Sequence, residues 1–526
     1  MNPNRPSTRN LATRTLAIAA IVCGTLSATG SVDASTATET DEMAFLDDVS
    51  PAMTIDHSTN CMPGATIGAT VSTDAVAYRN DRIVLRTSAS NPSVTTTVNN
   101  TLHAMYGNNV NYVGGIERIT FPTPPSGPAI VPVLSVTLLP RAGGAQHDIL
   151  GLARHLRNDS AKVASADYGL TSYGPYTHYF PYGYPVNVSA LTPPRTNLTA
   201  NGAPVGAGLK IGTGVKVGVF DTGLFAPDPI NLPTTTQLSS ADNDLVNLVS
   251  NGPKMVDFAP AGHAQGISGV LTTIVPGSTI ENVRINDRSG LATDVSAARA
   301  IASAMRTFSI GNYPNLLINA FGTAACNLDP TVVASAPLQP VGLEAVVEAV
   351  DRFDPLRAGG MLIVASAGNE ATTRPHYPAA FPSVLSVGAL DGTIDSDGSP
   401  WSSASKTAPV ADFSNRGAWV DTYALGVDLP TTHVNGYRFE YGADLIMGKA
   451  SVSGTSEAGP TVAGYIAELM TETGDRVRVA RDALIAGGKA PLPQCGTSTV
   501  EQGKAIVLSS LAAAITDPST ANPITC

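Results

Sequence analysis

Residues 453–464 have the sequence Ser-Gly-Thr-Ser-Glu-Ala-Gly-Pro-Thr-Val-Ala-Gly and lead into an apolar segment that ends at Met470. The small neighbours of Ser456 leave its hydroxyl open to a large substrate. A helix that begins here offers free backbone N–H groups, which suit a developing negative charge. Taken alone, such a stretch is more often an ordinary turn that caps a helix. Other segments must therefore decide whether Ser456 is catalytic.

Three further segments favour a catalytic serine. Residues 214–223 (Gly-Val-Lys-Val-Gly-Val-Phe-Asp-Thr-Gly) predict a buried parallel strand that ends at Asp221. Residues 361–370 (Met-Leu-Ile-Val-Ala-Ser-Ala-Gly-Asn-Glu) predict another, which brings an Asn to the carboxyl edge of the sheet, where open α/β sheets place their sites. His263 stands just before a run of small and apolar residues that can form a helix. Each feature singly is more often structural, but together they indicate a site.

The Asp, His and Ser occur in the chain order that subtilisin uses. Two later segments extend the match: 377–389 (Tyr-Pro-Ala-Ala-Phe-Pro-Ser-Val-Leu-Ser-Val-Gly-Ala) and 412–417 (Asp-Phe-Ser-Asn-Arg-Gly). On these motifs the chain resembles the subtilases, the subtilisin-like serine proteases, over roughly residues 205–515. The resemblance implies an α/β fold with a doubly wound parallel sheet, and a cis peptide bond at Tyr377-Pro378.

The resemblance also implies a mechanism. Asp221, His263 and Ser456 would form the catalytic triad, and the Asn369 side chain would bind the oxyanion together with the backbone N–H of Ser456. The predicted reaction is hydrolysis of peptide bonds through an acyl-enzyme, by a serine endopeptidase that needs no cofactor and no catalytic metal. A short connection after Gly269 argues against the strong calcium site of the family.

The substrate would bind as an extended peptide between two strands, Ser289-Gly290-Leu291 and Ala320-Phe321-Gly322. The pocket for the substrate residue before the cleaved bond, P1, would have two walls, Ala320-Phe321-Gly322 and Ser366-Ala367-Gly368. Small walls favour a large apolar P1 residue, whereas Glu370 at the pocket rim would favour Lys or Arg. The sequence leaves this choice open.

The chain departs from the family pattern near the site. Gln265 replaces a small hydroxyl residue close to the catalytic His, Glu457 replaces the Met common after the nucleophile, and Ala320 replaces a Ser. None of these changes removes a triad or oxyanion group. The main alternative function is a catalytically impaired subtilase-fold binding protein. An α/β-hydrolase esterase would need Gly-x-Ser-x-Gly and another residue order, so it is disfavoured.

The composition of the chain argues against some classes of binding partner. The 526 residues permit two or three domains, only 14% of them are charged, and the net charge of −11 disfavours nucleic acid and anionic membranes as partners. We expect a monomer that acts on proteins or peptides. Residues 1–34 predict a secretory signal peptide, because arginines precede a short apolar run and a small-residue cleavage pattern. We therefore predict a secreted protein, extracellular or periplasmic, with no stable membrane anchor.

The sequence after the signal peptide can be divided into segments by its strand-like and helix-like runs. An irregular extension at 35–75 precedes a small domain at 76–168, where strand-like and helix-like runs alternate as β-α-β-β-α-β. Subtilase inhibitor propeptides have this fold and this place, so the resemblance implies a zymogen whose own propeptide inhibits it. Residues 169–205, rich in Tyr, Gly and Pro, form a cleavable loop-like connector, with cleavage between Tyr168 and Gly206. The peptidase domain and a C-terminal tail follow at 206–526.

Four cysteines remain after removal of the signal, and in an exported chain they predict two disulfides. Three connectivities are possible. We favour one bond that closes the C-terminal tail and one that joins the N-terminal extension to the peptidase domain, pairing Cys495 with Cys526 and Cys61 with Cys326.

Overall fold

The structure is a computed structural model, and all the residues it describes belong to one compact unit, 42–526. Its segments are 53–56, 76–124, 127–160, 163–170, 176–178, 211–221, 235–238, 263–285, 292–307, 313–329, 331, 335–391, 409–427, 429–435, 446–488 and 503–506. The predicted signal peptide, most of the connector and the predicted substrate strand Ser289-Gly290-Leu291 lie outside these residues. No helix within them is long and apolar enough to cross a membrane.

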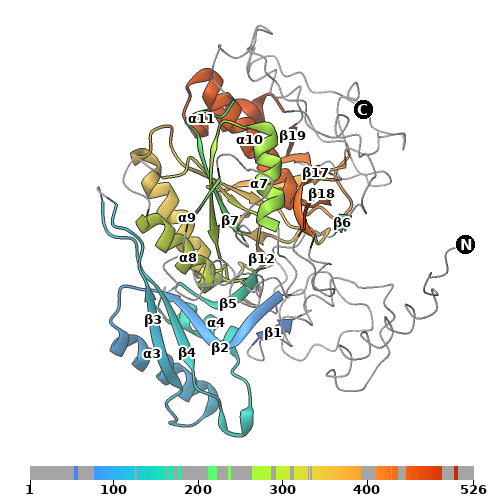
Figure 1. Cartoon of the computed structure of the whole chain (residues 1–526). Helices are drawn as coiled ribbons and strands as arrows, with labels where there is room; N and C mark the ends of the chain where they lie inside the picture. The colour runs from blue at the N-terminus through green and yellow to red at the C-terminus, as the bar shows by residue number, and fades with distance from the viewer. Residues whose placement is uncertain are drawn as a thin grey trace, which may run out of the picture. The chain divides into compact units, whose positions relative to one another are not determined.

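A parallel sheet forms the centre of the C-terminal region (Figure 1). Its strands lie in the order β19-β16-β15-β13-β11-β7-β9-β8, and every pairing between them is parallel. The bounds are β7 (Lys216–Asp221), β8 (Thr235–Leu238), β9 (Thr279–Arg284), β11 (Leu316–Asn319), β13 (Leu362–Ser366), β15 (Leu385–Leu390), β16 (Thr422–Leu425) and β19 (Lys504–Ile506).

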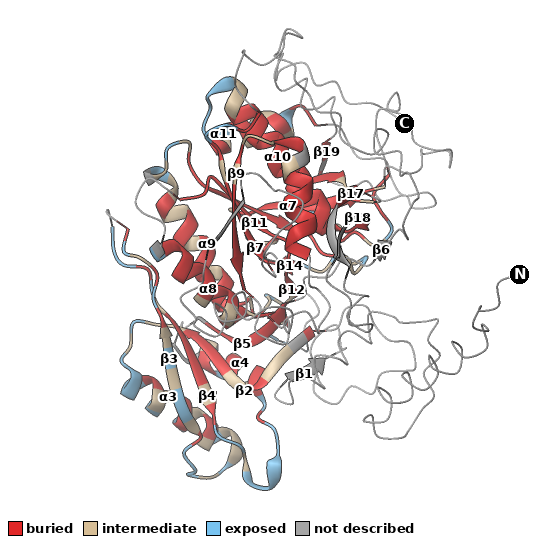
Figure 2. Cartoon of the chain, in the orientation of Figure 1, coloured by how far each residue is buried: buried red, intermediate tan, exposed pale blue. Residues whose placement is uncertain are grey.

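Helices cover both faces of this sheet (Figure 1). Along β7, Val217 and Val219 pack with α7 (His263–Ile274) and α10 (Thr455–Thr473), whereas Phe220 belongs to the core that holds α8 (Asp294–Thr307) and α9 (Val341–Phe353). Because neighbouring residues of a strand face opposite sides, a strand buried on both faces must be apolar throughout. Figure 2 shows this burial along the sheet. The predicted α/β fold with a parallel sheet is what the structure has.

An antiparallel sheet forms the N-terminal region, in the order β10-β5-β2-β4-β3, with β1 paired to β2. Along the chain its elements follow the predicted β-α-β-β-α-β order. They are β2 (Val76–Arg86), α3 (Asn91–Tyr106), β3 (Val113–Ile119), β4 (Val133–Leu138), α4 (Ile149–Ser160) and β5 (Val163–Leu170), flanked by β1 (Met53–Asp56) and β10 (Ala292–Thr293). Its apolar residues belong to the same buried core as α8 and α9.

Two segments predicted as irregular contain strands. β1 lies inside the N-terminal extension, and β6 (Tyr176–His178) lies inside the connector. β6 pairs with β18 (Ile446–Ser453), which also pairs with β17 (Leu429–Asn435). Local composition did not predict these two strands, and the partner of β6 lies hundreds of residues further along the chain.

The remaining elements are short or peripheral. Tyr377-Pro378 is cis, which confirms the prediction. Strand β12 pairs antiparallel with β14, and α11 packs against α10. The bounds are η1 (Ala142–Gly144), β12 (Thr323–Ala324), η3 (Asp354–Leu356), β14 (His376–Tyr377) and α11 (Val477–Ala486).

Candidate active site

Asp221 and His263 lie in direct contact at the carboxyl end of the sheet. Asp221 is the last residue of β7 and is fully buried, and His263 is the first residue of α7. Nδ1 of His263 lies 2.9 Å from each carboxylate oxygen of Asp221. An Nδ1–H that donates to this carboxylate leaves Nε2 as the basic nitrogen. Within the described part of the chain, the buried Nε2 makes no hydrogen bond.

The surroundings make His263 more basic. Burial by itself lowers its pKa, but the charge of Asp221, its hydrogen bond and the charge of Glu457 outweigh burial and raise the pKa above its ordinary value. The opposite charges favour the protonated ring. The Asp221–His263 pair can therefore accept a proton and stabilise the resulting imidazolium, although among the described residues Nε2 makes no hydrogen bond to the Ser456 hydroxyl.

Ser456 is the second residue of α10 and is almost fully buried. Its Oγ donates to the backbone carbonyl of Ala320, at 3.5 Å, so it lies beside the segment that follows β11. The preceding Thr455 connects the same turn to β13, because the Ser366 hydroxyl donates to the Thr455 carbonyl at 3.0 Å. The start of α10 is thus fixed against two neighbouring parallel strands, with helix N–H groups at the position of Ser456.

Asn369 follows β13 and is tied to the same turn. Its Oδ1 accepts hydrogen bonds from the backbone N–H of Thr455 at 2.8 Å and from the Thr455 hydroxyl at 2.9 Å. The Thr455 hydroxyl oxygen also accepts from the Gly368 N–H at 3.1 Å. Because these bonds hold the oxygen of the amide, the Nδ2 end is oriented away from Thr455. An amide donor so fixed suits an oxyanion site.

The structure brings both predicted P1 walls to this turn. Ala320-Phe321-Gly322 follows β11, and Ser366-Ala367-Gly368 ends and follows β13, which pairs with β11 in parallel. Glu370 does not point outward as a simple rim residue would. Its Oε2 accepts from the Asn415 amide at 2.5 Å, and its Oε1 lies 3.7 Å from Nε2 of His376. The predicted strand Ser289-Gly290-Leu291 lies outside the described residues.

Glu457 is a buried carboxyl group directly after Ser456. Burial raises its pKa to about 7, and His263 acts in the opposite direction. Oε2 of Glu457 makes no hydrogen bond within the described residues. Sequence comparison had marked Glu457 only as a departure from the family, and its electrostatic contact with His263 became visible only in the fold.

Sequence reasoning missed His376, a buried residue that contacts both predicted P1 walls. The available signal was its position directly before the Tyr-Pro pair, which family motifs place beside the pocket. Of the four predicted disulfide cysteines, only Cys326 lies among the described residues, and it is buried. Among those residues no group of three or more His, Cys, Asp or Glu is placed to hold a metal ion.

Comparison with known proteins identifies the family. A model of the subtilase family matches residues 212–485, about half of the chain, and the chain therefore belongs to the subtilase family. The match contains Asp221, His263, Asn369 and Ser456, together with all the strands of the parallel sheet except β19.

Individual relatives are more distant. The chain is 28% identical over 272 residues to a thermophilic serine proteinase of Bacillus sp. strain AK1, an alignment that covers 51% of this chain and 55% of that protein. Subtilisin DY of Bacillus licheniformis is 26% identical over 266 residues, which cover 50% and 78%. Thermitase of Thermoactinomyces vulgaris is 26% identical over 288 residues, which cover 54% and 84%. The chain thus spans little more than half the length of the first of these relatives.

Among solved structures, a cold adapted subtilisin-like serine proteinase aligns with 60% of this chain and 97% of its own. Its sequence identity is 17% and its TM-score is 0.41.

Proposed function

We propose that this protein is an exported serine endopeptidase of the subtilisin type, made as a zymogen. The proposal rests on two observations. Asp221 and His263 are hydrogen-bonded to each other, and Ser456 lies at the start of α10, which is held against the ends of β11 and β13. The buried acid, the base and the hydroxyl come from three separate elements. Their arrangement fits the roles that nucleophilic catalysis requires.

In the proposed mechanism, Ser456 Oγ attacks the carbonyl carbon of the peptide bond and His263 Nε2 accepts its proton. Asp221 holds the ring and stabilises the imidazolium. The negative oxygen of the tetrahedral intermediate accepts hydrogen bonds from the Asn369 Nδ2 and the Ser456 N–H. His263 then donates the proton to the leaving amine, and water repeats the sequence on the acyl-enzyme to release the acid.

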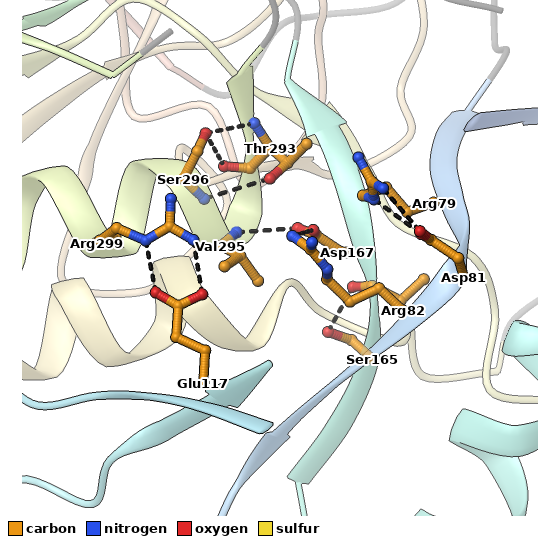
Figure 3. Close-up of polar contacts among 11 residues, drawn as sticks. Arg79, Asp81, Arg82, Glu117, Ser165, Asp167, Thr293, Val295, Ser296 and Arg299 are labelled. Carbon is orange, nitrogen blue, oxygen red and sulfur yellow. Dashed lines mark hydrogen bonds and ion pairs between the residues drawn. The ribbon is translucent and has the colours of Figure 1, made fainter. Parts of the chain in front are cut away.

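The proposed zymogen rests on the contact between the N-terminal sheet and α8, which Figure 3 shows. Asp167, on β5, is fully buried and accepts a hydrogen bond at 3.0 Å from the N–H of Val295, the second residue of α8. Free N–H groups at a helix start favour a negative charge, so this carboxylate adds to the capping that Thr293 and Ser296 give each other.

Further contacts join the same surfaces. Ser165 of β5 accepts from the N–H of Val341, at 3.2 Å, where α9 begins. Arg299 of α8 forms a two-bond ion pair with Glu117 of β3, at 2.6 and 2.7 Å (Figure 3). Arg86 of β2 pairs with Glu348 of α9. Strand β5 thus contacts the starts of both helices, which supports the proposal that residues 76–168 dock as a propeptide.

The N-terminal part of the connector pairs with strands at two points inside the proposed cleavage region. Gly169 and Leu170 pair with β10, and Tyr176–His178 pair with the end of β18, just before the turn of Ser456. Tyr176–His178 therefore lie beside the end of the strand that leads into that turn. This arrangement supports cleavage between Tyr168 and Gly206 by the enzyme itself.

The remaining parts of the proposal rest on sequence and family. Residues 1–34 would direct export, the four cysteines would form the two proposed disulfides, and the mature enzyme would act as a monomer on proteins or peptides. Two of the relatives are named as a serine proteinase and an alkaline protease, which supports the same activity here.

One experiment tests the catalytic proposal. A fluorophosphonate probe should label the wild-type protein, and Ser456→Ala should abolish labelling and accumulate an uncleaved precursor. N-terminal sequencing of the mature wild type should place its start between Tyr168 and Gly206. A folded protein that takes up no label and cleaves no peptide would favour the alternative, a subtilase-fold binding protein. A mature, fully active enzyme that keeps residues 76–168 attached would overturn the propeptide assignment.

A further inference from the structure

Both predicted P1 walls are hydrogen-bonded to the turn that carries Ser456. The Ala320 carbonyl of the first wall accepts a hydrogen bond from the Ser456 hydroxyl. In the second wall, the Ser366 hydroxyl donates to the Thr455 carbonyl and the Gly368 N–H donates to the Thr455 hydroxyl oxygen. The space between these walls therefore decides which substrate side chain fits next to the serine.

His376 occupies that space. It lies on β14, whose pairing with β12 places it opposite Ala324, two residues beyond the first wall. A Cβ atom built on Gly322 would lie 2.3 Å from Cε1 and 2.5 Å from Nδ1 of His376. A Cβ built on Gly368 would lie 3.2 Å from Cγ of the same ring. The imidazole thus lies against both walls. Glycine at position 322 leaves room for the ring, whereas at position 368 a Cβ would first meet Asn415 and Glu370.

The charged groups around His376 are Glu370 and Arg374. Oε1 of Glu370 lies 3.7 Å from Nε2, and the other carboxylate oxygen is held by the Asn415 amide. The Arg374 guanidinium donates to the Ala325 carbonyl at 2.8 Å. Burial lowers the pKa of His376, Glu370 opposes that effect and Arg374 adds to it. The ring is therefore neutral at neutral pH.

A purely structural histidine would have both ring nitrogens paired, because buried polar atoms are normally hydrogen-bonded. Nδ1 of His376 is buried and makes no hydrogen bond within the described residues. It lies on the side of the ring that contacts Gly322, the wall beside Ser456.

We propose that His376 determines P1 specificity: it fills the depth of the pocket, so the enzyme accepts short P1 side chains such as Ala and Ser and excludes aromatic and long ones. The inference rests on the proposed peptidase function. It replaces both expectations from the sequence, since the ring blocks a large apolar side chain and Glu370 is already engaged by Asn415 and His376.

The test compares succinyl-Ala-Ala-Pro-Xaa-p-nitroanilide substrates in which Xaa is Ala, Ser, Phe or Lys. The wild type should cleave the Ala and Ser substrates with a kcat/KM at least about tenfold above that for Phe and Lys, since pockets discriminate by such factors per misfitting group. His376→Gly should raise the Phe-to-Ala ratio of kcat/KM by about tenfold or more. His376→Phe, the control, removes the imidazole nitrogens but keeps a ring at least as large, so the Phe substrate should remain excluded.

The wild-type profile alone can overturn the proposal, because equal cleavage of the Phe and Ala substrates shows an open pocket whatever the variants do. The proposal is also overturned if His376→Gly still reacts with a small fluorophosphonate but its Phe-to-Ala ratio of kcat/KM is the same as that of the wild type. A different result, a folded wild type with no labelling and no cleavage of any substrate, would instead overturn the peptidase function itself.

Discussion

The proposed chemistry depends on single side chains whose positions are fixed by hydrogen bonds to neighbouring elements. Asn369 is the clearest case, because its oxygen accepts two bonds from Thr455 while its Nδ2 is the proposed oxyanion donor. Its two ends therefore have separable roles, one in positioning the turn and one in catalysis.

We predict that Asn369→Ala lowers kcat by about 10²–10³ with little change in KM, the range known for loss of one such donor in subtilisin. The donor acts mainly on charge that develops in the transition state. Steady-state kinetics on one p-nitroanilide substrate measures the effect. Thr455→Ala is the control, because it removes the hydroxyl's bonds to Asn369 Oδ1 and the Gly368 N–H but keeps the Asn369 Nδ2 donor. An equal loss in both variants would mean that Asn369 acts by positioning the turn.

Glu457 should set the acid limit of the activity. Its charge raises the pKa of His263, and catalysis needs the unprotonated ring. In Glu457→Gln the imidazolium loses that stabilisation, so the pKa of His263 falls and the acid limb of the kcat/KM profile moves to lower pH. A pH profile of wild type and variant checks the direction. A limb that stays in place or moves to higher pH would contradict an electrostatic role for Glu457.

At the scale of elements, the site depends on how closely α7 and α10 pack, since α7 begins with His263 and α10 carries Ser456 near its start. Gly464 of α10 lies against Ile274 of α7, and a Cβ at Gly464 would approach Cγ2 of that side chain to 2.8 Å. No larger residue fits between the helices without moving one of them.

We predict that Gly464→Ala destabilises the protein. Alanine gains about 1 kcal/mol of helix propensity over glycine, but overpacking costs about 1–3 kcal/mol. The net loss should lower the Tm and, by moving α7, reduce kcat. Gly459→Ala is a matched control on the same helix, because its Cβ would meet only the Ser366 hydroxyl at 3.5 Å, an ordinary contact. Thermal unfolding of both variants decides the matter, and equal Tm values would refute the packing argument.

At the scale of the whole molecule, two buried carboxyl groups, Asp167 of β5 and Asp294 of α8, lie where β5 meets the starts of α8 and α9. Burial raises the pKa of Asp167, although Arg82 and the Val295 N–H oppose it. Burial also raises the pKa of Asp294 to about 8, with the nearby Asp167 acting in the same direction and the Gly342 N–H opposing it. Both groups therefore bind protons more tightly in the contact than in water.

This linkage fixes the sign of the pH dependence. A carboxyl group whose pKa is raised in the docked state favours docking below its ordinary pKa, and that advantage is lost as the pH rises towards the raised pKa. After cleavage of the connector, we predict that residues 76–168 bind the rest of the protein progressively more weakly from pH 4 to pH 8. Inhibition of peptidase activity by the retained fragment measures this affinity. Asp294→Asn should flatten the dependence, and a complex that tightens with rising pH would contradict it.

The local sequence determined much of this architecture. Apolar runs such as those at 214–223 and 361–370 became β7 and β13, because a strand covered on both faces can tolerate little else. Motif order along the chain was enough to predict the family. The alternating runs at 76–168 predicted the β-α-β-β-α-β order, since each run carries its own period.

Only the tertiary structure decided what the site contains. His263 and Asp221 lie 42 residues apart and meet because β7 ends, and α7 begins, at the same edge of the sheet. The charge of Glu457 acts on His263 through that same convergence, and β14 brings His376 between two walls that belong to other strands. Composition and spacing describe neighbours along the chain, whereas pocket depth, burial and charge depend on neighbours in space. The family could thus be predicted from the sequence, while the proposed P1 specificity and pH dependence required the fold.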